Sequence, residues 1–232
     1  MPARTESIDE TVVRKAPIFQ GLDEAASNAL RTAMSPIKLR KGQVLFKEGD
    51  DGDHLYIVTN GKIKLGTKAA DGRENLLMIL GPGDMFGDLS LFDAGPRTAT
   101  ATAVTESRLL SLGQNKVMPW VKEHPEVSVH LLARLASRLR RTNEVVGDLV
   151  FSDVPGRVAK ALVDLGIKFG EKKEDGLLVA HDLTQEELAQ LVGASRETVN
   201  KALADFAGRG WIRLEARAVM ILDYERLLKR GR

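Results

Sequence analysis

The stretch of sequence that decides the fold is His181–Leu203, which reads HDLTQEELAQLVGASRETVNKAL. Thr184 followed by Glu187 forms a capping box, which predicts the start of a first helix. Three apolar residues form the inward stripe of that helix: Leu188, Leu191 and Val192. Gly193 can adopt the left-handed conformation that ends a helix, and Ser195 is placed to cap a second one. The inward positions of the second helix are Val199, Ala202 and Leu203. Two short helices joined by a three-residue turn predict a helix-turn-helix.

The outward face of the second helix carries side chains that can recognise base pairs. Four of them lie near its N-terminus: Arg196, Glu197, Asn200 and Lys201. Arginine and lysine can donate to guanine, and glutamate can accept from cytosine. The hydroxyls of Ser195 and Thr198, together with the amides of the helix N-terminus, suit phosphates. This face therefore indicates binding to double-stranded DNA.

The segments on either side extend this unit. Downstream, two apolar runs at 211–215 and 218–222 predict a small hairpin, as in winged helices. Upstream, Ser152–Gly156 interrupts a long helical pattern, and Asp153 is a natural N-cap for a helix over Val154–Lys168. We predict a charged loop over Ile167–Gly176, and a surface position for His181.

Residues 37–112 are predicted to form an all-β unit. Short apolar runs alternate there with turn dipeptides at spacings typical of a sandwich or jelly roll. Asn60-Gly61 between two apolar runs predicts a hairpin with a type I′ turn, in which both residues have positive φ.

A helical pattern follows from about Asn115. Six residues are spaced 3-4-3-4-3 along it, as in the seam of a coiled coil: Leu132, Leu135, Leu139, Thr142, Val146 and Leu149. One interpretation is a helix that packs on its own β domain. The other, which we favour, is a two-stranded coiled coil that makes a homodimer.

Composition excludes several classes of function. The 232 residues include no cysteine, so disulfides, thiolate-held zinc, iron–sulfur clusters and thiol nucleophiles are excluded. We find no dinucleotide, P-loop or metalloprotease motif, so no enzyme is expected. The first 13 residues do not resemble a signal peptide, and no run approaches the ~18 apolar residues of a membrane span. We expect a cytoplasmic protein with no metal and no membrane partner.

The β unit also contains the parts of an anion site. Gly87 allows close approach of backbone to a ligand, and the amides around Asp88–Ser90 can form a positive nest. Arg97 supplies a permanently charged fork for phosphate. The alternative is that Arg97 pairs with Asp88 and only closes a loop.

With these motifs in place, the chain resembles the cyclic-AMP receptor protein (Crp/Fnr) family of transcription regulators, most closely its actinobacterial Crp branch. The resemblance rests on GDLS…PRTA at 87–99, RRTN at 140–143, DVPGR at 153–157 and LTQEELAQLVGASRETVNKAL at 183–203. It implies an α+β chain with a cyclic-nucleotide-binding β-roll with N-terminal helices (1–114), a dimerisation helix (115–152) and a winged helix-turn-helix (153–232). It also implies cyclic AMP (cAMP) as effector, and RNA polymerase as a further partner.

The resemblance also assigns roles to residues. In the phosphate-binding cassette it places Gly87, Leu89, Ser90, Arg97 and Thr98, with Asp88 at the ribose position. Thr142 and Asn143 match the positions that touch adenine, one from each subunit. Arg196, Glu197 and Lys201 match the base readers, with Lys201 where many members have arginine.

One departure concerns the ligand. The family's cAMP binders carry glutamate in the cassette, where this chain has Asp88. The side chain is one methylene shorter, so it reaches about 1.5 Å less far. Two hypotheses follow: cAMP still binds, or the pocket accepts another cyclic nucleotide or none. A runner-up from another class is a cyclic-nucleotide-binding regulatory subunit of an enzyme.

Overall fold

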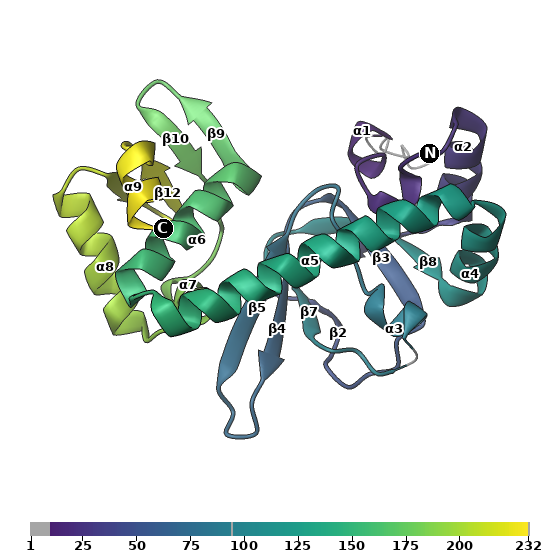
Figure 1. The fold of residues 1–232 in the computed structure, drawn as a ribbon, viewed down its shortest axis with the longest axis horizontal. Coiled ribbons are helices and arrows are strands. Elements are labelled where there is room, and N and C mark those ends of the chain that lie inside the picture. Colours follow the sequence, from purple (N-terminus) through teal and green to yellow (C-terminus); the bar gives the residue numbers. More distant parts are fainter. Residues whose placement is uncertain (1–9, 94, 232) are drawn as a thin grey trace, which may run out of the picture. The chain divides into compact units, whose positions relative to one another are not determined.

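The computed structural model describes residues 10–93 and 95–231, and the chain forms two compact units (Figure 1). The first unit contains the described residues up to Thr67 and Met78–Leu139, and the second contains Lys68–Leu77 and the chain from Arg140 onward. The stretch 1–9, which holds most of the N-terminal segment judged not to be a signal peptide, lies outside the described residues. Within the part of the chain that is described, no helix is both long enough and apolar enough to cross a membrane.

Up to Phe151, the described residues form eight strands and short helices, followed by one long helix. Most of these elements belong to the first unit, but Lys68–Leu77 and the long helix from Arg140 onward belong to the second. The strands are β1 (Ser35–Leu39), β2 (Val44–Phe46), β3 (His54–Asn60), β4 (Ile63–Lys68), β5 (Glu74–Leu80), β6 (Met85–Phe86), β7 (Thr100–Ala103) and β8 (Ser107–Gly113). The helices are α1 (Glu10–Val13), the 3-10 turn η1 (Pro17–Phe19), α2 (Glu24–Ala33), α3 (Leu89–Phe92), α4 (Gln114–Glu123) and α5 (Pro125–Phe151).

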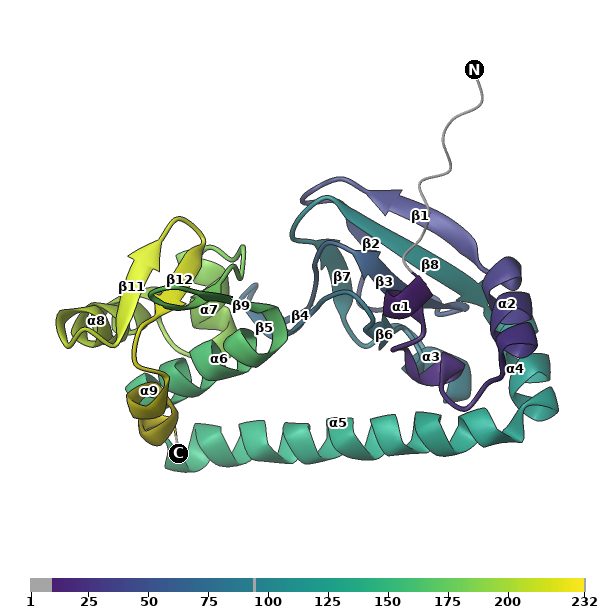
Figure 2. The same ribbon diagram turned by 90° about the horizontal axis from the view of Figure 1, so that it is seen from above.

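The eight strands form two antiparallel sheets, in the orders β1-β8-β3-β6 and β2-β7-β4-β5. Figure 2 shows β8 running between β1 and β3 in the first sheet. Successive side chains of a strand point to opposite faces, so β3 contributes to two cores. Tyr56 and Val58 join a core shared with the second sheet, whereas Leu55 and Ile57 join a core built with α1, α2, α4 and α5. The two-sheet β-roll is therefore confirmed.

The predicted hairpin at Asn60-Gly61 is wrong, because β3 and β4 lie in different sheets. Gly61 has a φ of +82°, but Asn60 is not among the residues with positive φ, so the turn is not of type I′. Lys62 instead donates its backbone N–H to Thr105 Oγ1 at 2.9 Å and to Ser107 Oγ at 3.1 Å. These bonds hold Lys62, the residue before β4, against the start of β8, and β4 then joins the second sheet instead of pairing with β3.

The long helix α5 spans 27 residues without interruption (Figure 1). Val127 and Leu131, near its start, are buried against the β-roll core. The predicted seam residues behave differently, because Leu132, Leu139, Val146 and Leu149 are 51–65% exposed in the single chain.

The second unit packs helices on a small sheet. Its helices are α6 (Val154–Phe169), α7 (Gln185–Val192), α8 (Arg196–Gly208) and α9 (Tyr224–Arg230). Its strands are β9 (Gly170–Lys173), β10 (Gly176–Val179), β11 (Ile212–Glu215) and β12 (Ala218–Ile221), in the order β11-β12-β10-β9. The predicted wing hairpin is confirmed as β11 and β12, which pair antiparallel.

The predicted charged loop over Ile167–Gly176 is wrong. Residues up to Phe169 belong to α6, and the rest forms β9 and the start of β10. Lys173 and Gly176 are register partners on either side of the turn. The charged side chains of β9 are exposed at a sheet edge, so they do not prevent pairing with β10. Charged residues are common on edge strands for this reason.

The expectation that His181 lies on the surface is also wrong. Its side chain is 4% exposed, and its Nδ1 accepts the backbone N–H of Leu183 at 3.0 Å. Asp182 between them has a φ of +61°, which gives the chain the tight bend that makes this bond possible. His181 therefore supports the entry to the capping box at Thr184.

Candidate functional site

Arg97 is the centre of a buried polar cluster in the first unit. The residue is 4% exposed. Its Nη1 donates to the carbonyl oxygen of Gly87 at 2.8 Å and to Ser90 Oγ at 3.0 Å, and its Nη2 donates to the carbonyl oxygen of His54 at 2.7 Å. The structure thus brings together Gly87, Ser90 and Arg97, three residues that the sequence singled out.

The positive charge of Arg97 is not paired with a carboxylate in the described chain. Its acceptors are neutral oxygens, and its buried Nε has no hydrogen-bond partner there. The guanidinium lies 4.4 Å from the centroid of the Phe46 ring and 5.6 Å from that of Tyr56. A buried charge is costly unless it is paired. The cluster is therefore suited to an anionic ligand.

Two titratable groups near the cluster, Tyr56 and Asp53, have shifted pKa values. Burial raises the pKa of the Tyr56 hydroxyl, an effect that the charge of Arg97 partly opposes. A hydrogen bond with His54, 2.7 Å between Nδ1 and Oδ1, is the main cause that lowers the pKa of Asp53, and Arg97 adds a smaller effect in the same direction. Asp53 is exposed and remains apart from the buried cluster.

Two glycines allow backbone to pass close to the cluster. Gly87 has a φ of +79°, and a Cβ there would lie 2.8 Å from Arg97 Nη1. A Cβ on Gly52 would collide with Ser90 Oγ. The loop that contains Gly52 is tied to Arg97 by two backbone bonds of 2.8 Å, from Gly49 N to Arg97 O and from Arg97 N to Asp50 O. The sequence analysis did not single out this loop, because its aspartates are residues that are common in any turn.

Asp88 lies beside the cluster without pairing with Arg97. It is 5% exposed, and its Oδ1 lies 3.5 Å from Nη1 of Arg138 on α5. That contact is an ion pair without hydrogen-bond geometry, since Oδ1 has no hydrogen-bond partner in the described residues. The alternative of an Arg97–Asp88 pair is therefore wrong. The sequence analysis did not single out Arg138.

The other predicted ligand residues are placed as follows. Leu89 begins α3 and is half-buried, and Thr98 is exposed next to Arg97. Thr142 and Asn143 are exposed on α5, four and five residues after Arg138. Their roles toward a ligand stay predictions.

The helix-turn-helix forms as the sequence predicts. Thr184 and Glu187 make both bonds of the capping box, and Gly193 has a φ of +63° and a ψ of +47°. The Ser195 side chain accepts from the backbone N–H of Thr198 at 3.2 Å, and the two hydroxyls lie 2.9 Å apart. Val199, Ala202 and Leu203 are buried, as expected for the inward face.

The outward face of α8 is open to solvent. Its four predicted reading residues, Arg196, Glu197, Asn200 and Lys201, are all exposed. Lys201 Nζ lies 2.9 Å from Glu197 Oε1, in a pair spaced four residues apart. Such a surface pair is weak, so both side chains remain available to a partner.

Arg157 fixes the helix-turn-helix to the end of α5, which sequence reasoning did not foresee. Its guanidinium donates to the carbonyl oxygens of Ser152, Val192 and Gly193 at 2.7, 2.9 and 3.3 Å. Ser152 directly follows α5, Val192 ends α7, and Gly193 lies in the turn before α8. One side chain thus positions the reading helix relative to Ser152, in the segment that interrupts the long helical pattern.

Two family models match the chain. Residues 36–124 match the cyclic nucleotide-binding domain, and residues 156–230 match the Crp-like helix-turn-helix domain. These ranges contain the Arg97 cluster and the exposed face of α8, respectively.

Named relatives extend over nearly the whole chain. The CRP-like cAMP-activated global transcriptional regulator of Mycobacterium tuberculosis is 55% identical, over 96% of this chain and 100% of the relative. The cyclic AMP receptor protein of Thermus thermophilus is 36% identical, over 87% of this chain and 90% of its own length. The first is named as a cAMP-activated regulator of transcription, and the second as a receptor for cyclic AMP.

Solved structures show the same fold. The catabolite activator protein of Thermus thermophilus matches with a TM-score of 0.54 and 33% identity, over 93% of this chain and 98% of that structure. FixK2 of Bradyrhizobium japonicum matches with a TM-score of 0.77, over 86% and 98% of the two chains. At 20% identity, the latter supports the fold alone.

Proposed function

The chain belongs to the Crp family of transcription regulators, and on that premise we propose that it is a cytoplasmic homodimer whose binding to double-stranded DNA depends on cAMP. The observation that supports the ligand is the buried, carboxylate-free charge of Arg97. A cyclic phosphate carries one negative charge and presents oxygens that accept hydrogen bonds. It therefore suits this position better than a neutral metabolite does.

The phosphate would be held by Arg97, by Ser90 and by the backbone around Gly87. The orphaned Nε of Arg97 is the donor that the protein itself leaves without a partner in the described residues. Arg97 is already fixed by three hydrogen bonds, so little side-chain entropy is lost on binding. Thr142 and Asn143 would recognise the base.

Asp88 would accept the ribose hydroxyl, as glutamate does in the family. Its Oδ1 is buried and has no hydrogen-bond partner among the described residues, which is the state expected of a carboxylate with an acceptor to offer. Arg138 holds this carboxylate from α5, so a ligand bound at Asp88 acts on the helix that carries the seam. The shorter reach of aspartate predicts weaker binding or a bridging water.

Calorimetry with cAMP tests this assignment directly. Native protein should release or absorb heat saturably, with one ligand per subunit, and Asp88→Glu should bind as well or better. Asp88→Asn, which keeps the size and removes the charge, serves as the matched control and should bind more weakly. Absence of heat in native protein together with clear binding by Asp88→Glu would eliminate cAMP as the natural ligand.

DNA binding is proposed through two copies of α8. Arg196, Glu197, Asn200 and Lys201 would lie in the major groove, and Ser195 and Thr198 would contact phosphates. Two subunits would read half-sites about 34–36 Å apart, so the operator should be a near-palindrome. The helix-turn-helix argues against the runner-up, a regulatory subunit of an enzyme, which needs no such face.

Dimerisation is proposed through the exposed seam of α5. Leu132, Leu139, Val146 and Leu149 expose apolar surface at coiled-coil spacing, and a second α5 would cover it. RNA polymerase remains a proposed partner.

A further inference from the structure

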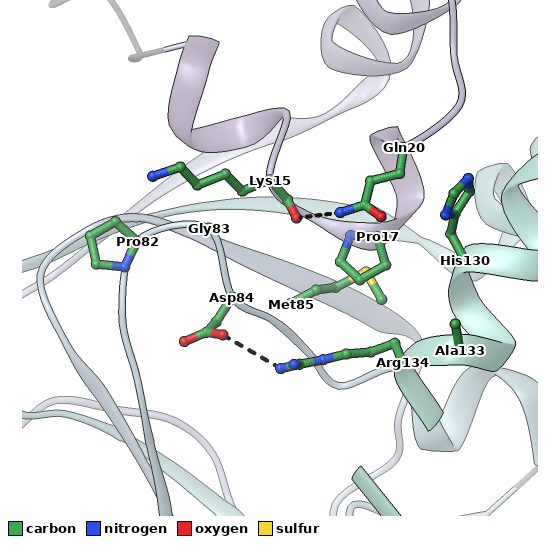
Figure 3. A pocket seen from close by; sticks show the side chains of 10 residues that line it. All are labelled: Lys15, Pro17, Gln20, Pro82, Gly83, Asp84, Met85, His130, Ala133 and Arg134. Carbon is green, nitrogen blue, oxygen red and sulfur yellow. Dashed lines mark hydrogen bonds and ion pairs between the residues drawn. The ribbon is translucent and has the colours of Figure 1, made fainter. Parts of the chain in front are cut away.

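A cavity in the first unit shares no lining residue with the Arg97 cluster. It measures about 350 Å³ and lies between the segment around Lys15–Gln20, the turn before β6, and α5 (Figure 3). Pockets for small molecules have volumes of ~300–1,000 Å³. The cavity is therefore large enough for a compact metabolite.

The polar groups that line the cavity are mostly basic or donors. Lys15 and Gln20 come from the N-terminal segment, and His130 and Arg134 come from α5. The acid among the lining residues is Asp84, whose Oδ2 accepts from Gly81 N at 2.8 Å and whose Oδ1 lies 3.4 Å from Arg134 Nη2. Asp84 is thus engaged by its own turn, and the lining keeps an excess of positive charge.

The walls are held by close contacts. A Cβ on Gly83 would lie 3.0 Å from the Cβ of Lys15, so the turn packs against the base of that side chain. Gln20 Nε2 donates to the carbonyl oxygen of Lys15 at 3.2 Å, which ties the two residues together (Figure 3). His130 Nε2 would lie 3.1 Å from a Cβ on Gly21. The donors are therefore carried by packed segments on two sides of the cavity.

Two separate ion pairs join α5 to the segment 84–88, one at this cavity and one beside the Arg97 cluster. Arg134 pairs with Asp84, and Arg138 pairs with Asp88. The spacing is four residues on both sides, which is about one turn of α5. An anion that draws Arg134 away from Asp84 would act one helical turn from the pair that holds Asp88.

We propose that this cavity binds a small phosphate-bearing metabolite, and that its occupancy changes the affinity of the Arg97 cluster for its ligand. The lining donors do not converge on one point, since the Lys15 ammonium and the His130 ring lie on opposite sides of the cavity (Figure 3). A phosphate monoester can accept from a lysine or guanidinium group on one side, while the hydroxyls of its organic part reach donors on the other. Binding itself is independent of the proposed function. The coupling rests on it.

Titration calorimetry with glucose 6-phosphate tests the binding. To exclude the Arg97 cluster, the titration is performed on native protein and on Arg97→Gln. Both should bind one molecule per subunit, and glucose should not bind. Lys15→Gln should weaken binding about tenfold, the loss expected for one hydrogen bond to a charged group. Lys41→Gln removes the same charge from an exposed position outside the cavity and should bind like native protein.

Arg134→Gln provides a second variant, with its fold checked by thermal unfolding. It should weaken glucose 6-phosphate binding and abolish any effect of the sugar phosphate on cAMP affinity. Equal binding by Lys15→Gln and Lys41→Gln, or no binding by native protein, would overturn the site. Citrate binding as tightly as glucose 6-phosphate would overturn the phosphate preference. Binding without any change in cAMP affinity would leave the site standing and overturn the coupling.

Discussion

Arg97 and Asp88 are two buried charges that lie close in the chain without neutralising each other. Arg97 is surrounded by neutral oxygens, and Asp88 is held by Arg138. Separating two buried charges in this way costs free energy that a ligand with both an anion and a hydroxyl can recover. The arrangement therefore favours binding over stability of the ligand-free protein.

Because Gly52 lies so close to Ser90, we predict that a side chain at position 52 weakens ligand binding. Gly52→Ala would place a methyl group against Ser90 Oγ and displace it from Arg97. Overpacking of this kind costs about 1–3 kcal/mol. We expect cAMP binding, measured by calorimetry, to weaken about tenfold or more.

Gly95→Ala is the control for that substitution. Its nearest contact would be the carbonyl oxygen of Asp93 at 3.7 Å, which is ordinary van der Waals contact. It should bind cAMP like native protein. Equal affinities for both variants would mean that Ser90 does not help to hold the ligand.

At the residue scale, sequence reasoning found the groups whose chemistry is local. Gly87 and Arg97 stand out by residue type, and their proximity is confirmed. Arg138 and His181 were missed or misplaced for one reason: tertiary packing, which the local sequence does not show, decides their surroundings. Arg138 is 50 residues from Asp88, and burial of His181 depends on packing rather than on the polar residues around it.

Among the elements, α6 begins at a charged cap that links it to α9. Asp153 accepts from Gly156 N at 2.9 Å and from Arg230 Nη2 at 2.6 Å. The hydrogen bond from Arg230 is the main cause that lowers the pKa of Asp153, followed by the bond from Gly156 N. A lowered pKa in the folded state contributes stability above the unfolded pKa, and that stability is lost as pH falls through the folded value.

Asp153→Ala should therefore lower the free energy of unfolding at pH 7 by about 1 kcal/mol, the usual cost of losing an N-cap. The difference from native protein should shrink as pH falls from about 4, the usual pKa of an unfolded aspartate, through the lower pKa of the native carboxylate. Denaturant unfolding at several pH values measures this. Asp205→Ala, at an exposed pair within α8, should cost less, and an equal pH-independent loss for Asp153→Ala would contradict the role of its charge.

The exposed face of α8 allows a prediction about base preference. Arg196→Ala should cost about 1–3 kcal/mol at one base position of the operator, because a bidentate contact with guanine is lost. Affinities for a set of single-base operator variants measure this. Lys229→Ala, a basic residue of α9, is the control and should not change base preference. Uniform weakening across all variants would make Arg196 a phosphate contact.

Elements with local signals were predicted well, and elements defined by partners were not. The boundaries of α6, α7 and α8 follow from Asp153, Thr184, Gly193 and Ser195, whose caps all form. The Asn60-Gly61 turn was located, but turn chemistry does not determine which sheet the next strand joins. The β9 strand was missed because its residues are charged, and its pairing with β10 is the reason it is a strand.

For the assembled protein, the proposed function depends on association through α5. Leu139 is 63% exposed in the single chain and lies within the predicted seam. Leu139→Asp would place two carboxylates in the core of the coiled coil, so we expect a dimer to become a monomer in sedimentation velocity. Val129→Asp, at a position that is 66% exposed and outside the seam spacing, should remain dimeric. Dimeric Leu139→Asp would mean that the subunits meet elsewhere.

Control of this regulator by cAMP is tested most directly by DNA binding of native protein, with and without cAMP, at one fixed salt concentration. The duplex should be one recovered from sheared genomic DNA by the protein itself. The salt concentration is fixed because salt alone changes such affinities by orders of magnitude. We expect cAMP to lower the dissociation constant for this duplex, and DNA to tighten cAMP binding by the same factor. Identical DNA-binding curves with and without cAMP, from protein shown by calorimetry to bind it, would contradict cAMP control of this regulator.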